Sequence, residues 1–184
     1  MTEKTPPESL TLPTKEEALQ IMRQLGLRGN IVKHEQSVMR KARNMAHNIT
    51  TVPVNMELVK IGALMHDIGR TKTHDMDHGI VGGAILRDMG FSIELARIAE
   101  VHSMAGLTAA EAKQFGLPAK DYLPETIEEK LVCLADKYFI GTKEVTIDER
   151  FGRWITKYGE TEFLLAQVRR AKILEEYVLR QIFN

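Results

Sequence analysis

Apolar residues recur at steps of three and four along almost all of this 184-residue chain, and this period most constrains its fold. It is the period of an α-helix with one buried face. Only residues 144–147 favour an extended conformation. We therefore predict an all-α fold, a single-domain helical bundle over residues 14–184. Residues 1–13 hold three of the six prolines and predict a mobile N-terminal tail.

Capping residues predict where the helices begin. Two capping boxes and three single caps precede apolar stripes: the boxes are Thr14 with Glu17 and Thr108 with Glu111, and the single caps are Asn30, Asn55 and Ser92. Further helices are expected from His78, after Thr126, from Asp148 to Tyr158, and from about Glu160 to Phe183. Residues 70–77 are polar and predict a loop.

The composition limits the kinds of partner. The 25 basic and 25 acidic residues cancel, so neither a nucleic-acid partner nor an anionic membrane surface is expected. The single cysteine, Cys133, lies in an apolar run and is expected in the core. The N-terminus has no apolar signal segment and no run is long enough to span a membrane. A cytoplasmic protein is expected, and a homodimer stays open.

An imidazole and a carboxylate stand side by side at the end of the apolar run from Ile61 to Met65. Burying both His66 and Asp67 costs free energy unless each finds a partner, and a metal ion suits both. Gly69 is expected to end this helix, where two adjacent side chains can converge on one point. The simpler interpretation is that His66 caps the helix and Asp67 opens a turn.

Three further histidines and one aspartate lie on separate predicted helices. His34 and His102 fall on apolar stripes, His78 begins a helix, and Asp136 stands in an apolar segment. Singly, each histidine is more often a core residue than a ligand. Together these side chains would each need a buried partner, whereas one shared metal centre satisfies all of them, as in other helical bundles.

These residues resemble the HD superfamily of metal-dependent phosphohydrolases. The order His34, then His66-Asp67, then Asp136 is similar to that of the superfamily, and His66-Asp67-Ile68-Gly69 matches its HDIG signature. The contexts of His78 and His102 look like the six-ligand, two-metal branch. The segment Leu131–Asp136 and the spacing resemble bacterial symmetrical diadenosine tetraphosphate hydrolases and uncharacterised HDIG-domain proteins. Those hydrolases usually carry Lys where this chain has Arg70.

The resemblance implies a ligand set and a reaction. Asp67 would bridge two metal ions; His34, His66 and Asp136 would hold one ion, and His78 and His102 the other. Imidazole and carboxylate ligands favour iron or manganese, with cobalt, nickel or zinc as further options. A bridging hydroxide would then attack a phosphoester or phosphoanhydride of a nucleotide or dinucleoside polyphosphate. Asp67 and Arg70 are the expected catalytic residues.

Basic side chains are candidates for binding the phosphates. Arg70 is the first choice, because its planar fork can bind two oxygens at once. Lys72, Lys137 and Lys143 are second choices. Each of these lysines is otherwise expected to be a surface charge, and Lys137 could instead pair with the adjacent Asp136.

Three alternatives stay open. The first is a single-metal 5'-nucleotidase-like enzyme in which His78 and His102 only line the pocket. The second is a non-catalytic nucleotide-binding sensor, and the third an oxygenase-like role for an iron pair. His74 is expected to be solvent-exposed, with a lesser chance of a substrate contact, and His47 is expected at the surface.

Overall fold

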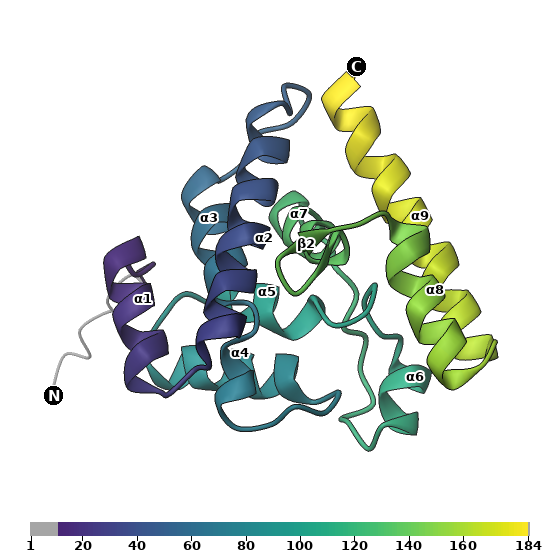
Figure 1. The fold of residues 1–184 in the computed structure, drawn as a ribbon. Coiled ribbons are helices and arrows are strands. Elements are labelled where there is room, and N and C mark those ends of the chain that lie inside the picture. Colours follow the sequence, from purple (N-terminus) through teal and green to yellow (C-terminus); the bar gives the residue numbers. More distant parts are fainter. Residues whose placement is uncertain (1–10, 184) are drawn as a thin grey trace, which may run out of the picture.

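The computed structural model describes residues 11–183 and confirms the all-α prediction (Figure 1). Its elements in chain order are α1 Lys15–Gln24, α2 Gly29–His47, α3 Met56–Met65, the 3-10 helix η1 Ile68–Thr71, α4 His78–Asp88, α5 Ile93–Val101, α6 Ala109–Gln114, α7 Ile127–Lys137, β1 Phe139–Ile140, β2 Lys143–Glu144, α8 Ile147–Tyr158 and α9 Glu162–Phe183.

The predicted helix starts agree with the structure at most positions. Thr14 and Thr108 both form capping boxes, and Asn55 and Ser92 accept a backbone N–H with their side chains. Asn30 is the exception, and its prediction as a cap is wrong. Helix α2 already begins at Gly29, because Arg28 is the residue with extended backbone there, and no side chain caps this end.

The loop and strand predictions are right in part. Residues 68–71 form the η1 turn, so the loop predicted at 70–77 begins later than expected. The extended segment lies earlier than the predicted residues 144–147. The two-residue strands β1 and β2 pair antiparallel in a short hairpin, with Phe139 opposite Glu144. Ile147 already starts α8 and is buried.

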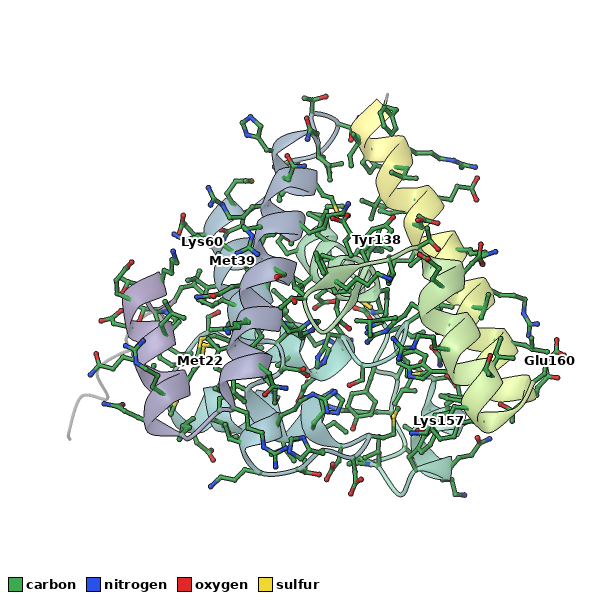
Figure 2. The ribbon with its side chains drawn as sticks, in the orientation of Figure 1. Met22, Met39, Lys60, Tyr138, Lys157 and Glu160 are labelled. Carbon is green, nitrogen blue, oxygen red and sulfur yellow. The ribbon has the colours of Figure 1, made fainter. Side chains whose placement is uncertain are left out.

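One core connects helices that are far apart in the sequence. Helices α2, α3, α5 and α7 surround it, and α1 covers one side while α8 and α9 lie next to each other on the other side (Figure 1). Met22 of α1 and Met39 of α2 belong to this core, whereas Lys157 and Glu160 lie at the exposed end of α8 (Figure 2). Cys133 is fully buried, as predicted.

The N-terminal segment is described only from residue 11. The predicted mobile tail at residues 1–13 therefore lies mostly outside the described residues. Of the part that is described, Thr11 forms a parallel bridge with Phe91, Leu12 packs against the core and Pro13 is buried. Among residues 11–183, no helix has the length and apolar character needed to cross a membrane.

Candidate metal centre

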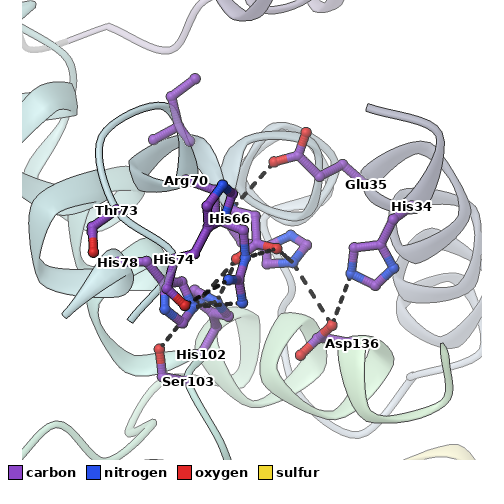
Figure 3. A network of polar contacts seen from close by, with 12 residues as sticks. His34, Glu35, His66, Arg70, Thr73, His74, His78, His102, Ser103 and Asp136 are labelled. Atoms are coloured by element: carbon purple, nitrogen blue, oxygen red, sulfur yellow. Dashed lines mark hydrogen bonds and ion pairs between the residues drawn. The ribbon is translucent and has the colours of Figure 1, made fainter. Parts of the chain in front are cut away.

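The predicted ligands reach one place from five helices. His66 and His102 directly follow α3 and α5, His78 is the first residue of α4, and His34 and Asp136 lie within α2 and α7. All of them, with Asp67, are buried. Their side chains converge from opposite sides, with His34 and Asp136 on one and His78 and His102 on the other (Figure 3). The core packing therefore fixes their relative positions.

The role predicted for Gly69 is wrong. Helix α3 ends at Met65, so His66 and Asp67 already lie beyond it, and Gly69 sits inside η1 with an ordinary negative φ. Gly69 is instead needed for space, because a β-carbon there would collide with the backbone of His78. The glycine brings η1 and α4 together, and with them Asp67 and His78.

Each of the four imidazoles is oriented by a main-chain carbonyl. Their Nδ1 atoms lie at hydrogen-bond distance from carbonyl oxygens: His34 to Gly141 at 2.7 Å, His66 to Ala63 at 2.8 Å, His78 to Asp75 at 2.6 Å and His102 to Ala99 at 2.6 Å. A carbonyl oxygen only accepts, so each Nδ1 carries the proton and donates it. Each Nε2 of a neutral ring then presents a lone pair to the site, as a metal ligand must.

The Nε2 atoms need a cation between them. The Nε2 atoms of His78 and His102 are 3.1 Å apart, and they lie 3.3 and 3.2 Å from Oδ1 of Asp67. Lone pairs this close repel unless a proton or a metal ion joins them. The Nε2 of His66 is buried and has no hydrogen-bond partner among the described residues. Protein donors reach only part of the cluster: Nη2 of Arg70 and Oγ of Ser103 lie 3.3 and 3.2 Å from Nε2 of His78, but no donor in residues 11–183 reaches Nε2 of His66. The set of ligand atoms therefore still fits a metal ion.

Asp67 is shared by two groups of potential ligands. His34, His66 and Asp67 bring their ligand atoms within 4.8 Å of one another, and so do Asp67, His78 and His102. Both groups could hold a metal ion. Asp67 belongs to both groups, as the resemblance implies, whereas Asp136 belongs to neither, and the binding of metal by these residues stays a prediction.

Asp136 lies beside the first group. Its Oδ1 is 3.0 Å from Nε2 of His34 and 3.8 Å from Nε2 of His66. Its Oδ2 pairs with Lys137, whose Nζ also donates to the carbonyl of His102 at 2.9 Å. The expectation that Lys137 is a surface charge is wrong, since it is 1% exposed, and the alternative of a pair with Asp136 is confirmed. Lys137 thus joins α7 to the end of α5.

Burial and neighbouring charges prepare the ligands for a cation. Burial lowers the pKa of His66 to about 3 and that of His78 to about 4, so both rings are neutral at pH 7. Burial also lowers the pKa of His34, but Asp136 outweighs it and the net shift is upward. Burial alone would raise the pKa of Asp67, yet His102, His66 and Arg70 hold that pKa well below its usual range. Lys137 and His34 do the same for Asp136.

Glu35 belongs to the site and was missed from the sequence. It is fully buried, and its Oε1 accepts the backbone N–H of Asp67 at 3.2 Å. Burial and the charge of Asp67 raise the pKa of its carboxyl well above the usual range. A signal was present, because Glu35 lies four residues after Ile31 and three before Val38 and so falls on the apolar face of α2.

The candidate phosphate-binding residues differ in their position. Arg70 lies beside the ligands: its Nε donates to Oδ2 of Asp67 at 2.7 Å, and its Nη2 is 3.3 Å from Nε2 of His78. Lys72 and Lys143 are exposed, and neither lines the cavity over the site. His74 and His47 are exposed, as predicted, and His74 lines that cavity.

A cavity of about 1150 Å³ opens over the ligands. Its floor contains His34, Asp67, His78, His102 and Asp136, and its walls include Arg28, Arg70, Lys137 and Arg150. Four cationic side chains around a carboxylate and imidazole cluster suit a negatively charged ligand.

Comparison with known proteins places this site in a family. The HD domain model matches residues 31–139, more than half of the chain. An uncharacterised protein of Methanocaldococcus jannaschii is 46% identical over 147 residues, which cover 79% of this chain and 86% of that protein. A tRNA (cytidine(56)-2'-O)-methyltransferase of Picrophilus torridus is 37% identical over 165 residues, which are 90% of this chain but only 46% of the methyltransferase.

Solved structures support the same fold. The HD domain of the L. monocytogenes phosphodiesterase PgpH superposes with a TM-score of 0.53 at 18% identity, over 93% of this chain and 100% of that domain. Its complex with cyclic-di-AMP superposes with a TM-score of 0.54 at 17% identity, over 92% and 97% of the two chains. The chain belongs to the HD domain family.

Proposed function

We propose that this protein uses two divalent transition-metal ions to hydrolyse a phosphoester or phosphoanhydride bond of a nucleotide or dinucleoside polyphosphate. One observation carries the proposal: two groups of potential metal ligands share the carboxylate of Asp67. Two ions held on one carboxylate lie close enough to act on a single phosphate, which is the arrangement of two-metal phosphohydrolases.

Each residue has a role that follows from its contacts. Asp67 would bridge the ions, with His34, His66 and Asp136 on one side and His78 and His102 on the other. The Nδ1 bonds to main-chain carbonyls hold the four Nε2 atoms in place. When bound, the metal pair supplies a nucleophile at neutral pH by lowering the pKa of water, and it neutralises charge on the phosphate.

Arg70 is the proposed phosphate ligand. Its side chain lines the cavity, is 27% exposed and is anchored through Nε to Asp67. A guanidinium fixed at one nitrogen presents its remaining N–H groups in a known direction, which suits a tetrahedral oxyanion. Lys137 is bound to Asp136 and to the carbonyl of His102. We therefore propose that Lys137 orients Asp136 and does not bind phosphate. Lys72 and Lys143 remain secondary candidates for phosphate contacts.

Iron and manganese are the proposed metals. Both suit a mixed set of imidazole and carboxylate ligands, and cobalt, nickel and zinc would bind the same atoms. The thiol of Cys133 donates to the main-chain carbonyl of His102 at 3.6 Å, and burial raises its pKa to about 11, so thiolate ligation does not compete.

The proposal is tested by metal analysis together with a substrate panel. Purified protein is expected to hold close to two transition-metal ions per chain and to release phosphate or a nucleotide from at least one panel member. The panel contains mononucleotides, dinucleoside polyphosphates and cyclic dinucleotides, the last because this fold has been solved with cyclic-di-AMP. Asp67→Ala is expected to lose both the metal and the turnover. A metal-loaded protein that binds nucleotides but leaves them intact would favour the non-catalytic sensor.

A second candidate substrate is the phosphodiester or terminal phosphate of RNA. Two tRNA (cytidine(56)-2'-O)-methyltransferases, from P. torridus and Thermoplasma volcanium, each contain a part that is 37% identical to this chain. The chain spans less than half of either, so the methyltransferase activity itself is not transferred. A phosphohydrolase unit joined to a tRNA-modifying enzyme would place RNA within its reach. Short oligoribonucleotides are therefore added to the panel. Their hydrolysis would favour RNA as the substrate, and hydrolysis of free nucleotides alone would favour the first proposal.

A further inference from the structure

Aromatic side chains form part of the cavity wall. We call Phe115, Trp154, Tyr158 and Phe163 the aromatic wall; all four line the cavity. Trp154 and Tyr158 are one turn apart on α8, and Phe115 follows α6 next to the start of α9. Three of the four lie beyond residue 139, where the match to the HD domain ends. The wall is therefore supplied mostly by the segment that follows the family core.

Packing accounts for two members of the aromatic wall, Trp154 and Phe163, which lie against the hydrophobic core, but not for the other two. Tyr158 is 60% exposed and Phe115 is 40% exposed, so neither ring gains much from burial inside the protein. The rings of Phe115 and Phe163 lie edge to face with centroids 5.1 Å apart, at the cavity surface. Exposed aromatic rings that gather on a concave surface mark a binding site more often than a structural cluster.

Arg150 joins the aromatic wall to the metal centre. Its Nη1 donates to the carbonyl of Phe139, and its Nη2 lies 4.0 Å from Oδ2 of Asp136. The same guanidinium lies 4.8 Å from the centroid of the Trp154 ring. A single side chain therefore spans the space between a predicted metal ligand and the indole. Because the guanidinium covers one face of the indole, a ligand would stack on the other face.

We propose that the aromatic wall stacks the nucleobase of a substrate whose phosphate lies at the metal centre. This inference rests on the proposed function and adds to it that the base, as well as the phosphate, is recognised. Every nucleobase has a π-face, and stacking on an aromatic side chain contributes about 1–3 kcal/mol per base, largely independent of its identity. The cationic side chains that line the cavity match the phosphate of a nucleotide, and the aromatic wall matches its base.

The size of the cavity bears on which nucleotide enters. At about 1150 Å³ it exceeds the ~300–1,000 Å³ typical of a site for one small ligand. The wall also has two parts: Trp154 and Tyr158, one turn apart on α8, form the first pair, and the edge-to-face rings of Phe115 and Phe163 form the second. A ligand with two bases, either a dinucleotide or the end of an RNA strand, would use both pairs, whereas a mononucleotide would use one.

Trp154 provides a direct measure of stacking, because it is the only tryptophan of the chain. Its fluorescence is recorded while metal-loaded protein is titrated with AMP or with ribose 5-phosphate, which has the same phosphate and sugar but no base. AMP is expected to quench the signal and to bind at least about ten-fold more tightly than ribose 5-phosphate. The titration is repeated with diadenosine tetraphosphate and with a short oligoribonucleotide. Whichever of these two ligands binds more tightly shows whether the second base belongs to a dinucleotide or to an RNA strand.

Two leucine variants locate the effect. Tyr158→Leu removes a ring of the aromatic wall and is expected to weaken AMP binding about ten-fold, with little effect on ribose 5-phosphate. Tyr177→Leu is the matched control, since Tyr177 is 40% exposed on α9 and does not line the cavity.

The results separate this inference from the proposed function. Equal binding of AMP and ribose 5-phosphate, or equal behaviour of the two leucine variants, would overturn base stacking. Metal-dependent phosphate release from the substrate panel is scored independently, so the hydrolase proposal would stand after such a result. Conversely, strong base-dependent quenching without any hydrolysis would retain the stacking site and remove the hydrolase.

Discussion

The carbonyl oxygen of His78 lies so close to Gly69 that a β-carbon on residue 69 would stand 1.9 Å from it. The backbone nitrogen of Gly82 would lie 2.6 Å from the same β-carbon. Both neighbours are main-chain atoms and cannot rotate away. The last residue of the His-Asp-Ile-Gly step thus sets the distance between η1 and α4, and with it the approach of Asp67 and His78.

Gly69→Ala is expected to destabilise the protein severely. Overpacking a well-filled site usually costs about 1–3 kcal/mol, and we expect a loss of at least about 3 kcal/mol because only the backbone can yield. Urea unfolding measures this loss. Gly152→Ala is the control: it lies within α8 with no atom within 4 Å of the added β-carbon, and it should stabilise by about 0.5–1 kcal/mol. Equal stability of the two variants would refute the steric argument.

His102→Ala is expected to remove one of two bound metal ions. His102 belongs to the second ligand group only, whereas Asp67 is shared by both groups. Metal analysis should therefore give about half of the wild-type content for His102→Ala and almost none for Asp67→Ala. An undiminished metal content in His102→Ala would support the single-metal nucleotidase, in which His78 and His102 only line the pocket.

Removal of metal by a chelator should lower the melting temperature. A ligand present at 100 times its Kd stabilises the native state by about 2.7 kcal/mol, and for a domain of this size each kcal/mol shifts Tm by about 2–4 °C. We expect a decrease of roughly 5–10 °C in differential scanning calorimetry. The Asp67→Ala variant, which should bind no metal, provides the baseline; if the chelator shifts its Tm as well, the stabilisation does not come from this site.

Glu35→Gln and Glu35→Met separate the acceptor role of Glu35 from its bulk. Glutamine keeps an oxygen that can accept the N–H of Asp67, so its effect on the free energy of unfolding should stay below about 1 kcal/mol. Methionine leaves that buried N–H without its acceptor and should cost about 1–3 kcal/mol. Metal affinity should fall about ten-fold in Glu35→Met, because the group that orients Asp67 is lost. Identical thermal and metal titrations for both variants would show that only volume matters.

The sequence predicts those parts of the site that lie on a periodic pattern. His34 and His102 stand on apolar stripes, and a buried imidazole at such a position needs a partner, so its convergence with other polar groups could be inferred. The same inference applies to Asp67, because it comes directly after an apolar run and His66. What made these predictions possible is the cost of burying an unpaired polar group, which is a local property of each helix.

Other contributions depend on contacts that no local pattern contains. The sequence places Lys137 at the surface because charged residues usually lie there, yet α7 packs so that its Nζ reaches the carbonyl of His102, 35 residues away. No local pattern marks Trp154 as a cavity residue, because its place in the wall depends on how α8 packs against the rest of the fold. Glu35 had a local signal, but its partner, the N–H of Asp67, is 32 residues away.

The main-chain origin of the groups that orient the imidazoles has a consequence for mutation. Because Gly141, Ala63, Asp75 and Ala99 act through carbonyl oxygens, no side chain at these positions takes part in the bond that fixes each ring. An outer shell built from the peptide backbone is preserved for as long as the helices keep their course. The position of the four rings therefore responds to any change that moves the backbone, such as a bulkier residue at the fully buried Ala63 or Ala99, or a non-glycine residue at Gly141, whose φ is +60°.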